Sequence, residues 1–156
     1  MSDQAQDNTP VFTIEKIYVK DLSLEVPNAP QCYLERDPAE ITLQMQTGAE
    51  AVGDGIFNVV LTLTVTAKIG DKTQFLIEAA QAGIFQIRNV PNEELEPIVA
   101  VACPNILFPY ARETVSDAVT RAGFPPVLLA PVNFEAAYRD RLAQQQAGGP
   151  HEIPVQ

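Results

Sequence analysis

Apolar and polar residues alternate along much of the first half of the chain, the period-two pattern of strands that bury one face. The clearest run is residues 56–70, in which aliphatic side chains alternate with threonines. The pair Gly70 and Asp71 ends this run and favours a tight hairpin into a further strand over residues 73–87. The pattern predicts two long antiparallel strands joined by a two-residue turn.

Two shorter alternating runs precede these strands. Residues 22–26 alternate and stop at Pro27, and residues 41–45 alternate before a glycine-containing loop at 48–55. The segment between them, residues 27–38, is rich in proline, which favours an extended connection over a tight turn. The chain therefore predicts a four-stranded antiparallel sheet. Neither of its faces is cleanly polar, so we expect one face to pack on helix and the other to meet a second subunit.

The pattern changes after Asn92. Three acids in a first turn favour a helix start, and Pro97 is tolerated there; the acids are Glu93, Glu94 and Glu96. Pro104 and Pro109 should kink or interrupt the helix, because proline lacks a backbone N–H and clashes with the preceding turn. A better helical segment follows at residues 111–122 and should end at Gly123.

An apolar loop over residues 124–129 separates this segment from a final helix that Asn133 can cap. Glu135 and Arg139 in that helix have the i,i+4 spacing of an ion pair. We expect an α+β fold with two C-terminal helices. A disordered start over residues 1–10, one domain over 11–147 and a flexible tail over 148–156 complete the predicted organisation.

Composition narrows the class of protein. A chain of 156 residues fits one domain with its own core. Its net charge of −10 argues against a nucleic-acid binder and against an anionic membrane surface, since both need clustered Lys and Arg. Cys32 and Cys103 lack neighbours at zinc-ligand spacing and are expected to be free thiols, with no metal site. We find no signal peptide or membrane-spanning run, which predicts a cytoplasmic protein.

Catalytic chemistry is hard to find in this sequence. The single histidine, His151, lies in the tail, which argues against a buried nucleophile and base pair. A phosphate-binding glycine motif is missing, so we expect no ATP and no other cofactor. The carboxylate clusters fit a helix start and a solvated strand face. The sequence favours a binding protein over an enzyme.

Four blocks of sequence resemble the SecB family of bacterial protein-export chaperones. They are IYVKDLSLEVPNAP at 17–30, GIFQI at 83–87, CPNILFPYARE at 103–113, and FPP at 124–126 followed by LAPVNF at 129–134. The resemblance implies an ATP-independent holdase that keeps unfolded precursor proteins competent for export and hands them to the motor ATPase SecA. It also implies a homotetramer built as a dimer of dimers.

The resemblance assigns roles to particular residues. A flat surface for SecA would comprise Asp21, Glu25, Leu76 and Glu78. An apolar groove for unfolded clients would be lined by Leu24, Val26, Tyr33, Leu43, Met45, Phe124, Val127, Leu128 and Leu129. Contacts between subunits would involve Ile77, Ala79, Gln81, Ile106 and Tyr110.

Two alternatives stay open at this point. A SecB-like chaperone dedicated to one partner, such as an antitoxin, would share the fold and the groove. A small-ligand-binding protein would need a polar pocket with converging titratable groups, and the sequence gives no sign of one. The tail GGPHEIPVQ matches no motif that would decide among these functions.

Overall fold

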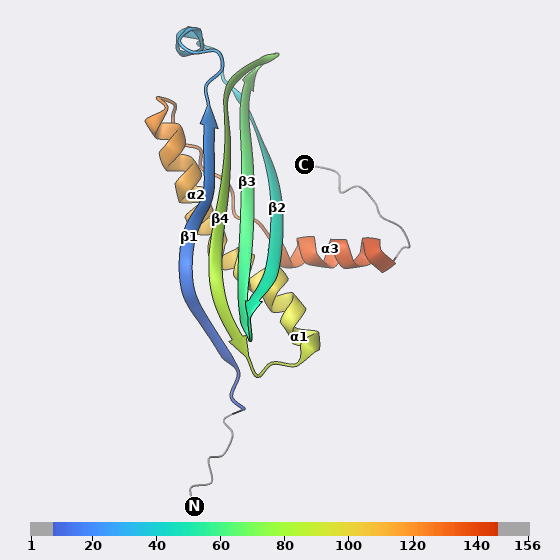
Figure 1. Ribbon diagram of the computed structural model, residues 1–156. Coiled ribbons are helices and arrows are strands. Elements are labelled where there is room, and N and C mark those ends of the chain that lie inside the picture. The colour runs from blue at the N-terminus through green and yellow to red at the C-terminus, as the bar shows by residue number, and fades with distance from the viewer. Residues whose placement is uncertain (1–7, 147–156) are drawn as a thin grey trace, which may run out of the picture.

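A computed structural model describes residues 8–146, with the elements labelled in Figure 1. The strands are β1 (Val11–Glu25), β2 (Glu40–Gly53), β3 (Ile56–Ile69) and β4 (Lys72–Arg88). The helical elements are the 3-10 turn η1 (Gln31–Leu34), α1 (Asn92–Pro97), the π-helical turn η2 (Ile98–Ala102), α2 (Cys103–Arg121) and α3 (Phe134–Gln146). The expectations for residues 1–7, His151 and the tail lie outside the described residues.

The four strands form one antiparallel sheet in the order β1-β4-β3-β2. The predicted run at 56–70 and the hairpin at Gly70 are confirmed, and this glycine has a φ of 60°, a conformation that favours residues without a Cβ. Strand β1 carries two bulges, because Glu15 and Lys20 have no facing residue in its pairing with β4. Each bulge shifts the alternation by one position, so the stretch between the bulges is out of phase with the rest of the strand. The second bulge restores the phase, and Leu22 and Leu24 lie on the same face as Phe12 and Ile14.

Strand β2 is longer than the sequence suggests. The predicted loop at 48–55 is wrong for most of its length, since Gly48, Ala49 and Ala51 pair in register with β3 and only residues 54–55 form the turn. The small side chains hide the alternation, but they leave the backbone free to pair. The connection at 27–38 is extended in part and also contains the short helical turn η1.

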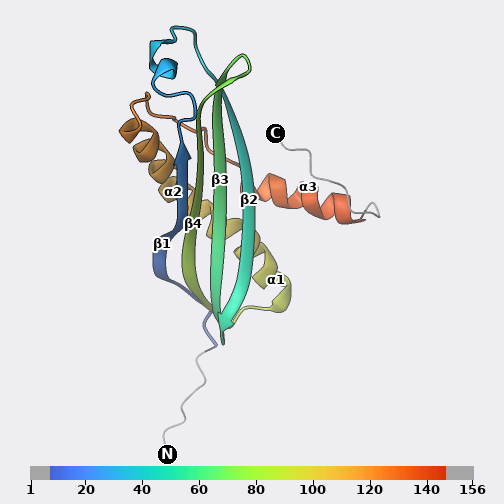
Figure 2. The ribbon, with the colours of Figure 1, turned by 45° about the horizontal axis from the view of Figure 1, so that its top comes forward.

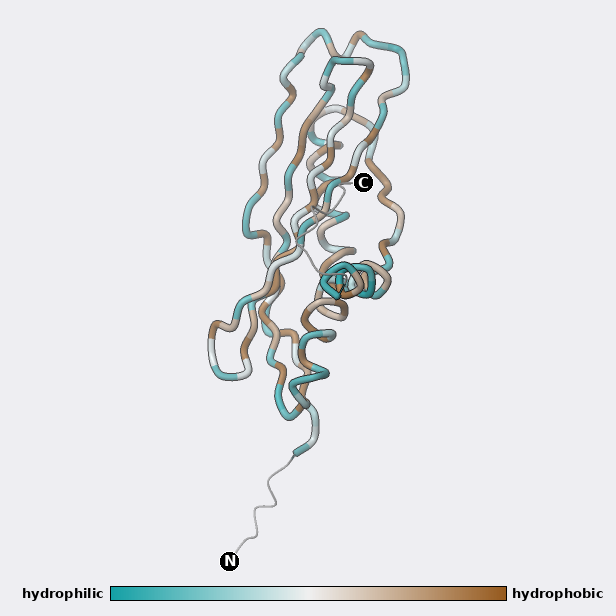
Figure 3. The backbone as a smooth tube through the Cα atoms, turned by 90° about the vertical axis from the view of Figure 1, so that its right-hand side faces the viewer, coloured by the Kyte–Doolittle hydropathy of each residue, from teal (hydrophilic) through white to brown (hydrophobic). Residues whose placement is uncertain are grey.

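One face of the sheet is covered by α2, which crosses it diagonally, while no helix or strand of residues 8–146 covers the opposite face in Figures 1 and 2. Figure 3 shows the two layers from the side. Side chains of β3 and β4 meet α2 in a core whose largest fully buried members include Phe85, Leu61, Leu63, Ile77 and Leu107. We call the covered side the helix face and the other side the open face.

The helical segment between β4 and the apolar loop runs without a break from Asn92 to Arg121, although the prolines predict an interruption. Its irregular part is η2, which ends two residues before Pro104. Since Pro104 has no N–H to donate to the carbonyl four residues back, the regular ladder cannot pass through this turn. Pro109 lies inside α2 on its exposed side, where water can reach the carbonyl that lacks a donor. The predicted interruption at Pro109 is therefore wrong.

The predicted ends of the C-terminal helices are confirmed. Gly123 has a φ of 92°, and the N–H of Phe124 donates to the carbonyl of Val119, the hydrogen bond of a helix stop with a left-handed residue. Asn133 caps α3, because its Oδ1 accepts from the N–H of Ala136 at 2.9 Å. Helix α3 projects past β2 in Figure 1, and Phe134 is its buried residue.

Candidate functional site

A cavity of about 900 Å³ lies between the connection that follows β1, the upper ends of the strands and the segment after α2. We call it the apolar groove. Its wall is mainly apolar and comes from four parts of the chain: Cys32, Tyr33, Glu35, Asp37, Pro38 and Ala39; Ile41 and Leu43; Ile69, Gln74 and Phe75; and residues 123–132. Segments far apart in sequence thus build one concave surface.

Three aromatic rings hold the wall of the apolar groove together. The Phe124 ring lies 5.2 Å from Tyr33 and 5.0 Å from Phe75 between centroids, within the distance range of interacting aromatic pairs. The Tyr33 hydroxyl donates to the carbonyl of Ala122 at 2.7 Å, at the end of α2. These contacts fix the connection after β1 against the helix end, so the groove is a defined shape before any ligand arrives.

The structure brings most of the predicted groove residues together and separates three of them. Tyr33, Leu43, Phe124, Val127, Leu128 and Leu129 all line the apolar groove. Leu24, Val26 and Met45 are not among its lining residues, so their role in client binding stays a prediction. Leu24 lies on the helix face of β1, Val26 follows the end of that strand, and Met45 packs against the core.

The four residues expected to form a flat acidic surface do lie on one face. Strand pairing sets Glu25 opposite Leu76 and Ser23 opposite Glu78, with Asp21 one pair further along. Their partners on β3 are threonines, and the Thr64 hydroxyl donates to a Glu78 carboxylate oxygen at 3.3 Å. This region of the open face therefore carries three carboxylates and one half-exposed leucine on a flat, hydroxyl-rich sheet.

The residues expected to contact another subunit on β4, Ile77, Ala79 and Gln81, are buried within their own chain. The first two are 0% exposed and Gln81 is 3% exposed, because α2 of the same chain covers them. Among the other predicted interface residues, Tyr110 is half exposed on the far side of α2 and Ile106 is partly buried.

A row of exposed apolar side chains lies along the helix face of the edge strand β1. Its members are Phe12, Ile14, Val19, Leu22 and Leu24, which are 36 to 47% exposed. We call this set the β1 strip. An exposed apolar edge strand of this length is a surface that another chain can cover.

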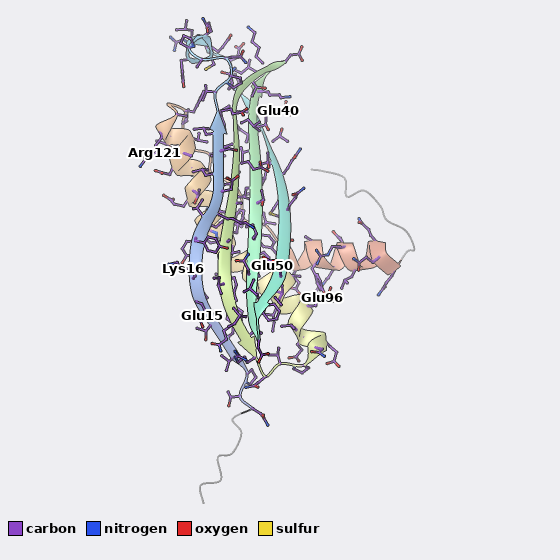
Figure 4. The ribbon with its side chains drawn as sticks, in the orientation of Figure 1. Glu15, Lys16, Glu40, Glu50, Glu96 and Arg121 are labelled. Atoms are coloured by element: carbon purple, nitrogen blue, oxygen red, sulfur yellow. The ribbon has the colours of Figure 1, made fainter. Side chains whose placement is uncertain are left out.

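Within residues 8–146, no group of His, Cys, Asp and Glu side chains has the arrangement of a metal site. Helices of the described part also lack the combination of length and apolarity that spanning a bilayer requires. Burial raises the pKa of the Cys103 thiol from 9.0 to about 12, which keeps it protonated and unreactive near neutral pH. A smaller cavity of about 460 Å³ lies where α1 and η2 face β2, and Figure 4 labels Glu50 and Glu96 at its border.

The sequence model of the family described as preprotein translocase subunit SecB matches residues 5–145. The chain belongs to the SecB family. A protein-export protein SecB of Dechloromonas aromatica is 65% identical over 151 residues, which cover 97% of this chain and 99% of that protein. A protein-export protein SecB of Chromobacterium violaceum is 64% identical over 149 residues, which cover 96% of this chain and 99% of that protein.

A solved structure with a similar fold is a SecB-like chaperone of Mycobacterium tuberculosis, in complex with a peptide from an antitoxin. The two chains share a TM-score of 0.63 at 21% identity, over 78% of this chain and 87% of that one. This similarity shows that the SecB family member described here has the SecB-like fold.

Part of the groove of this SecB family member was not predicted from its sequence. Ile41 and Gln74 line it, as do prolines of the loop and of the connection. Ile41 carries the same alternation signal as Leu43, so the pattern could have found it. Gln74 gives no signal, because its position depends on an irregularity in strand pairing.

Proposed function

We propose that this chain is an ATP-independent chaperone that binds unfolded precursor proteins in the apolar groove and delivers them to SecA for export, in the cytoplasm. The observation that carries the proposal is a preformed groove of about 900 Å³ with exposed leucine at its border, in a chain of the SecB family. The names of the relatives at 57 to 65% identity favour general export over service to a single antitoxin.

Binding of many different clients follows from the nature of the groove wall. Each Å² of apolar surface removed from water contributes about 25 cal/mol, whatever the sequence of the client. Because aromatic contacts fix the wall in advance, little of that gain is lost to ordering the chaperone. A folded protein has already buried its apolar side chains and offers the groove little, so unfolded chains are favoured.

We assign the handover to the acidic part of the open face, with Asp21, Glu25, Leu76 and Glu78 as the docking surface for SecA. Carboxylates on a flat sheet favour a basic partner and act mainly on the association rate. This surface is on the opposite side of the sheet from α2. A client in the apolar groove and SecA on the open face can therefore be bound at the same time.

Charge reversal tests this assignment. Glu78→Lys should weaken SecA binding at least tenfold at low salt and leave the affinity for an unfolded polypeptide unchanged. Asp140→Lys, an exposed reversal on α3, is the matched control for net charge and should bind SecA normally. Equal loss in both variants would mean that overall charge, and not this surface, governs docking.

We propose further that the chain assembles as a dimer of dimers, with the β1 strip covered by a second copy. Its exposed apolar side chains and the unpaired edge of β1 support contact between strands of two subunits. A Val19→Glu, Leu22→Glu double variant should lower the mass measured by light scattering. Thr13→Glu, on the opposite face of the same strand, should keep the wild-type mass, and an unchanged mass in the double variant would refute this placement.

The holdase proposal itself is tested by aggregation of a denatured secretory precursor. The chain should suppress aggregation without nucleotide and should not bind the same precursor once folded. Suppression that requires ATP, or equal binding to the folded protein, would contradict the proposal.

A further inference from the structure

Two glutamines are buried beneath the helix side of β4, and they differ in their hydrogen bonding. Gln81 is satisfied, since its Nε2 donates to the carbonyl of Tyr18 at 3.3 Å and its Oε1 accepts from the Thr114 hydroxyl at 2.9 Å. Gln74 is 4% exposed, and its Nε2 has no hydrogen-bond partner among residues 8–146. A buried donor without an acceptor is costly, so such groups are uncommon and call for an explanation.

Gln74 owes its position to a bulge at the start of β4. Phe75 faces Ala67 and Thr73 faces Lys68, so Gln74 is an extra residue without a facing partner. Bulges of this kind redirect a side chain relative to the regular alternation. Here the side chain joins the lining of the apolar groove, next to Phe75.

A side-chain hydrogen bond holds this bulge in place. The Asn28 side chain, in the connection after β1, donates from Nδ2 to the carbonyl of Thr73 at 2.9 Å. The same connection supplies Tyr33 to the groove wall. The irregular strand start is therefore held in place by the element that also shapes the groove.

We infer that the Gln74 amide is a client-binding donor, which gives a hydrogen bond to a backbone carbonyl of an extended polypeptide in the apolar groove. The inference rests on the proposed holdase function and adds a polar element to it. A backbone carbonyl is the acceptor that every unfolded chain carries between its apolar side chains. A donor at the base of an apolar wall thus favours extended polypeptide over a detergent or lipid of equal hydrophobicity.

The donor lies just beneath the groove surface, next to the segment at 124–132, which has neither helix nor strand. The Phe124 ring anchors the start of this segment against Tyr33 and Phe75, and residues 125–132 of the segment lack such ring contacts. A client whose side chains displace residues beyond Phe124 brings its own carbonyl to Nε2 and leaves the aromatic wall in place. In the free chaperone the unpaired Nε2 donor costs free energy, because it is buried without an acceptor. Binding of the client supplies the acceptor and removes this cost.

The test compares two Gln→Met variants of the full chain. Gln74→Met keeps the volume and removes the donor, and Gln44→Met makes the same change on the open face of β2, where the residue is exposed. The probe is a reduced and carbamidomethylated secretory protein, which stays unfolded, and the readouts are its affinity by titration calorimetry and the urea midpoint of the chaperone. Gln74→Leu is the second variant if Gln74→Met does not fold.

We expect Gln74→Met to bind the probe about three- to tenfold more weakly, the value of one net hydrogen bond, while its urea midpoint stays equal or rises. Gln44→Met should match the wild type. Equal or tighter binding by Gln74→Met, or a loss of affinity accompanied by a lower urea midpoint, would overturn the inference alone. A wild-type chain that binds no unfolded probe would overturn the holdase proposal together with it.

Discussion

Leu128 offers the sharpest test of the apolar groove, because it lines the groove and is 85% exposed. Fully burying a leucine side chain contributes about 1.5–3 kcal/mol. The exposed share of Leu128 leaves about 1.3–2.5 kcal/mol to be gained when a client covers it, which corresponds to about 10- to 60-fold in affinity. Leu128→Ser should therefore weaken binding of a short unfolded peptide by this factor.

The stability of the free chain should hardly change, since a substitution at so exposed a position stays within about 0.5 kcal/mol. Leu34 provides the matched control, because it is 73% exposed and does not belong to the groove lining. Fluorescence anisotropy with a labelled peptide and urea denaturation measure the two quantities. Equal loss of affinity in Leu34→Ser, or no loss in Leu128→Ser, would refute the assignment of the client site to this groove.

Two further predictions concern the core. Gly83→Ala should destabilise the fold by about 1–3 kcal/mol, since its new Cβ would lie 2.7 Å from the Phe85 ring, whereas Gly48→Ala has open space and should not destabilise it; urea denaturation of both variants decides. Cys103 should make stability fall as pH rises above 9.0 toward 12, because the thiol ionises in the unfolded chain while burial keeps it protonated in the folded one. Cys103→Ala should remove that part of the pH dependence, and an unchanged slope would contradict the assignment.

The parts of the fold that the sequence predicts well are those with a local physical cause. The alternation at 56–70 needs only the covered helix face, and the helix stop at Gly123 needs only a left-handed residue. The cap at Asn133 likewise depends on neighbours three residues away. Such features depend on residues close together in the sequence, so they can be predicted from the sequence alone.

Features that depend on strand pairing could not be predicted. Bulges at Glu15 and Lys20 shift the alternation within β1, and the bulge at Gln74 turns a polar side chain into the groove. A strand residue that lacks a facing partner in the neighbouring strand is not marked by any pattern in the local sequence. The extension of β2 through Gly48 was hidden for a related reason, since small residues carry no face preference.

The acidic surface and the predicted interface residues show what alternation alone can and cannot predict. Alternation places Glu78 and Ile77 on opposite faces correctly, but it does not say which face α2 covers. Glu78 therefore lies on the open face, as predicted for a docking residue, whereas Ile77 is buried within its own subunit.

The measurement that tests the central claim most directly is the refolding rate of a denatured secretory precursor with and without the purified chain, in the absence of ATP. We expect equimolar chain to slow refolding, and the Leu128→Ser variant to slow it less than the Leu34→Ser variant does. A refolding rate that stays unchanged at several-fold excess of the chain would show that the chain does not hold unfolded precursors.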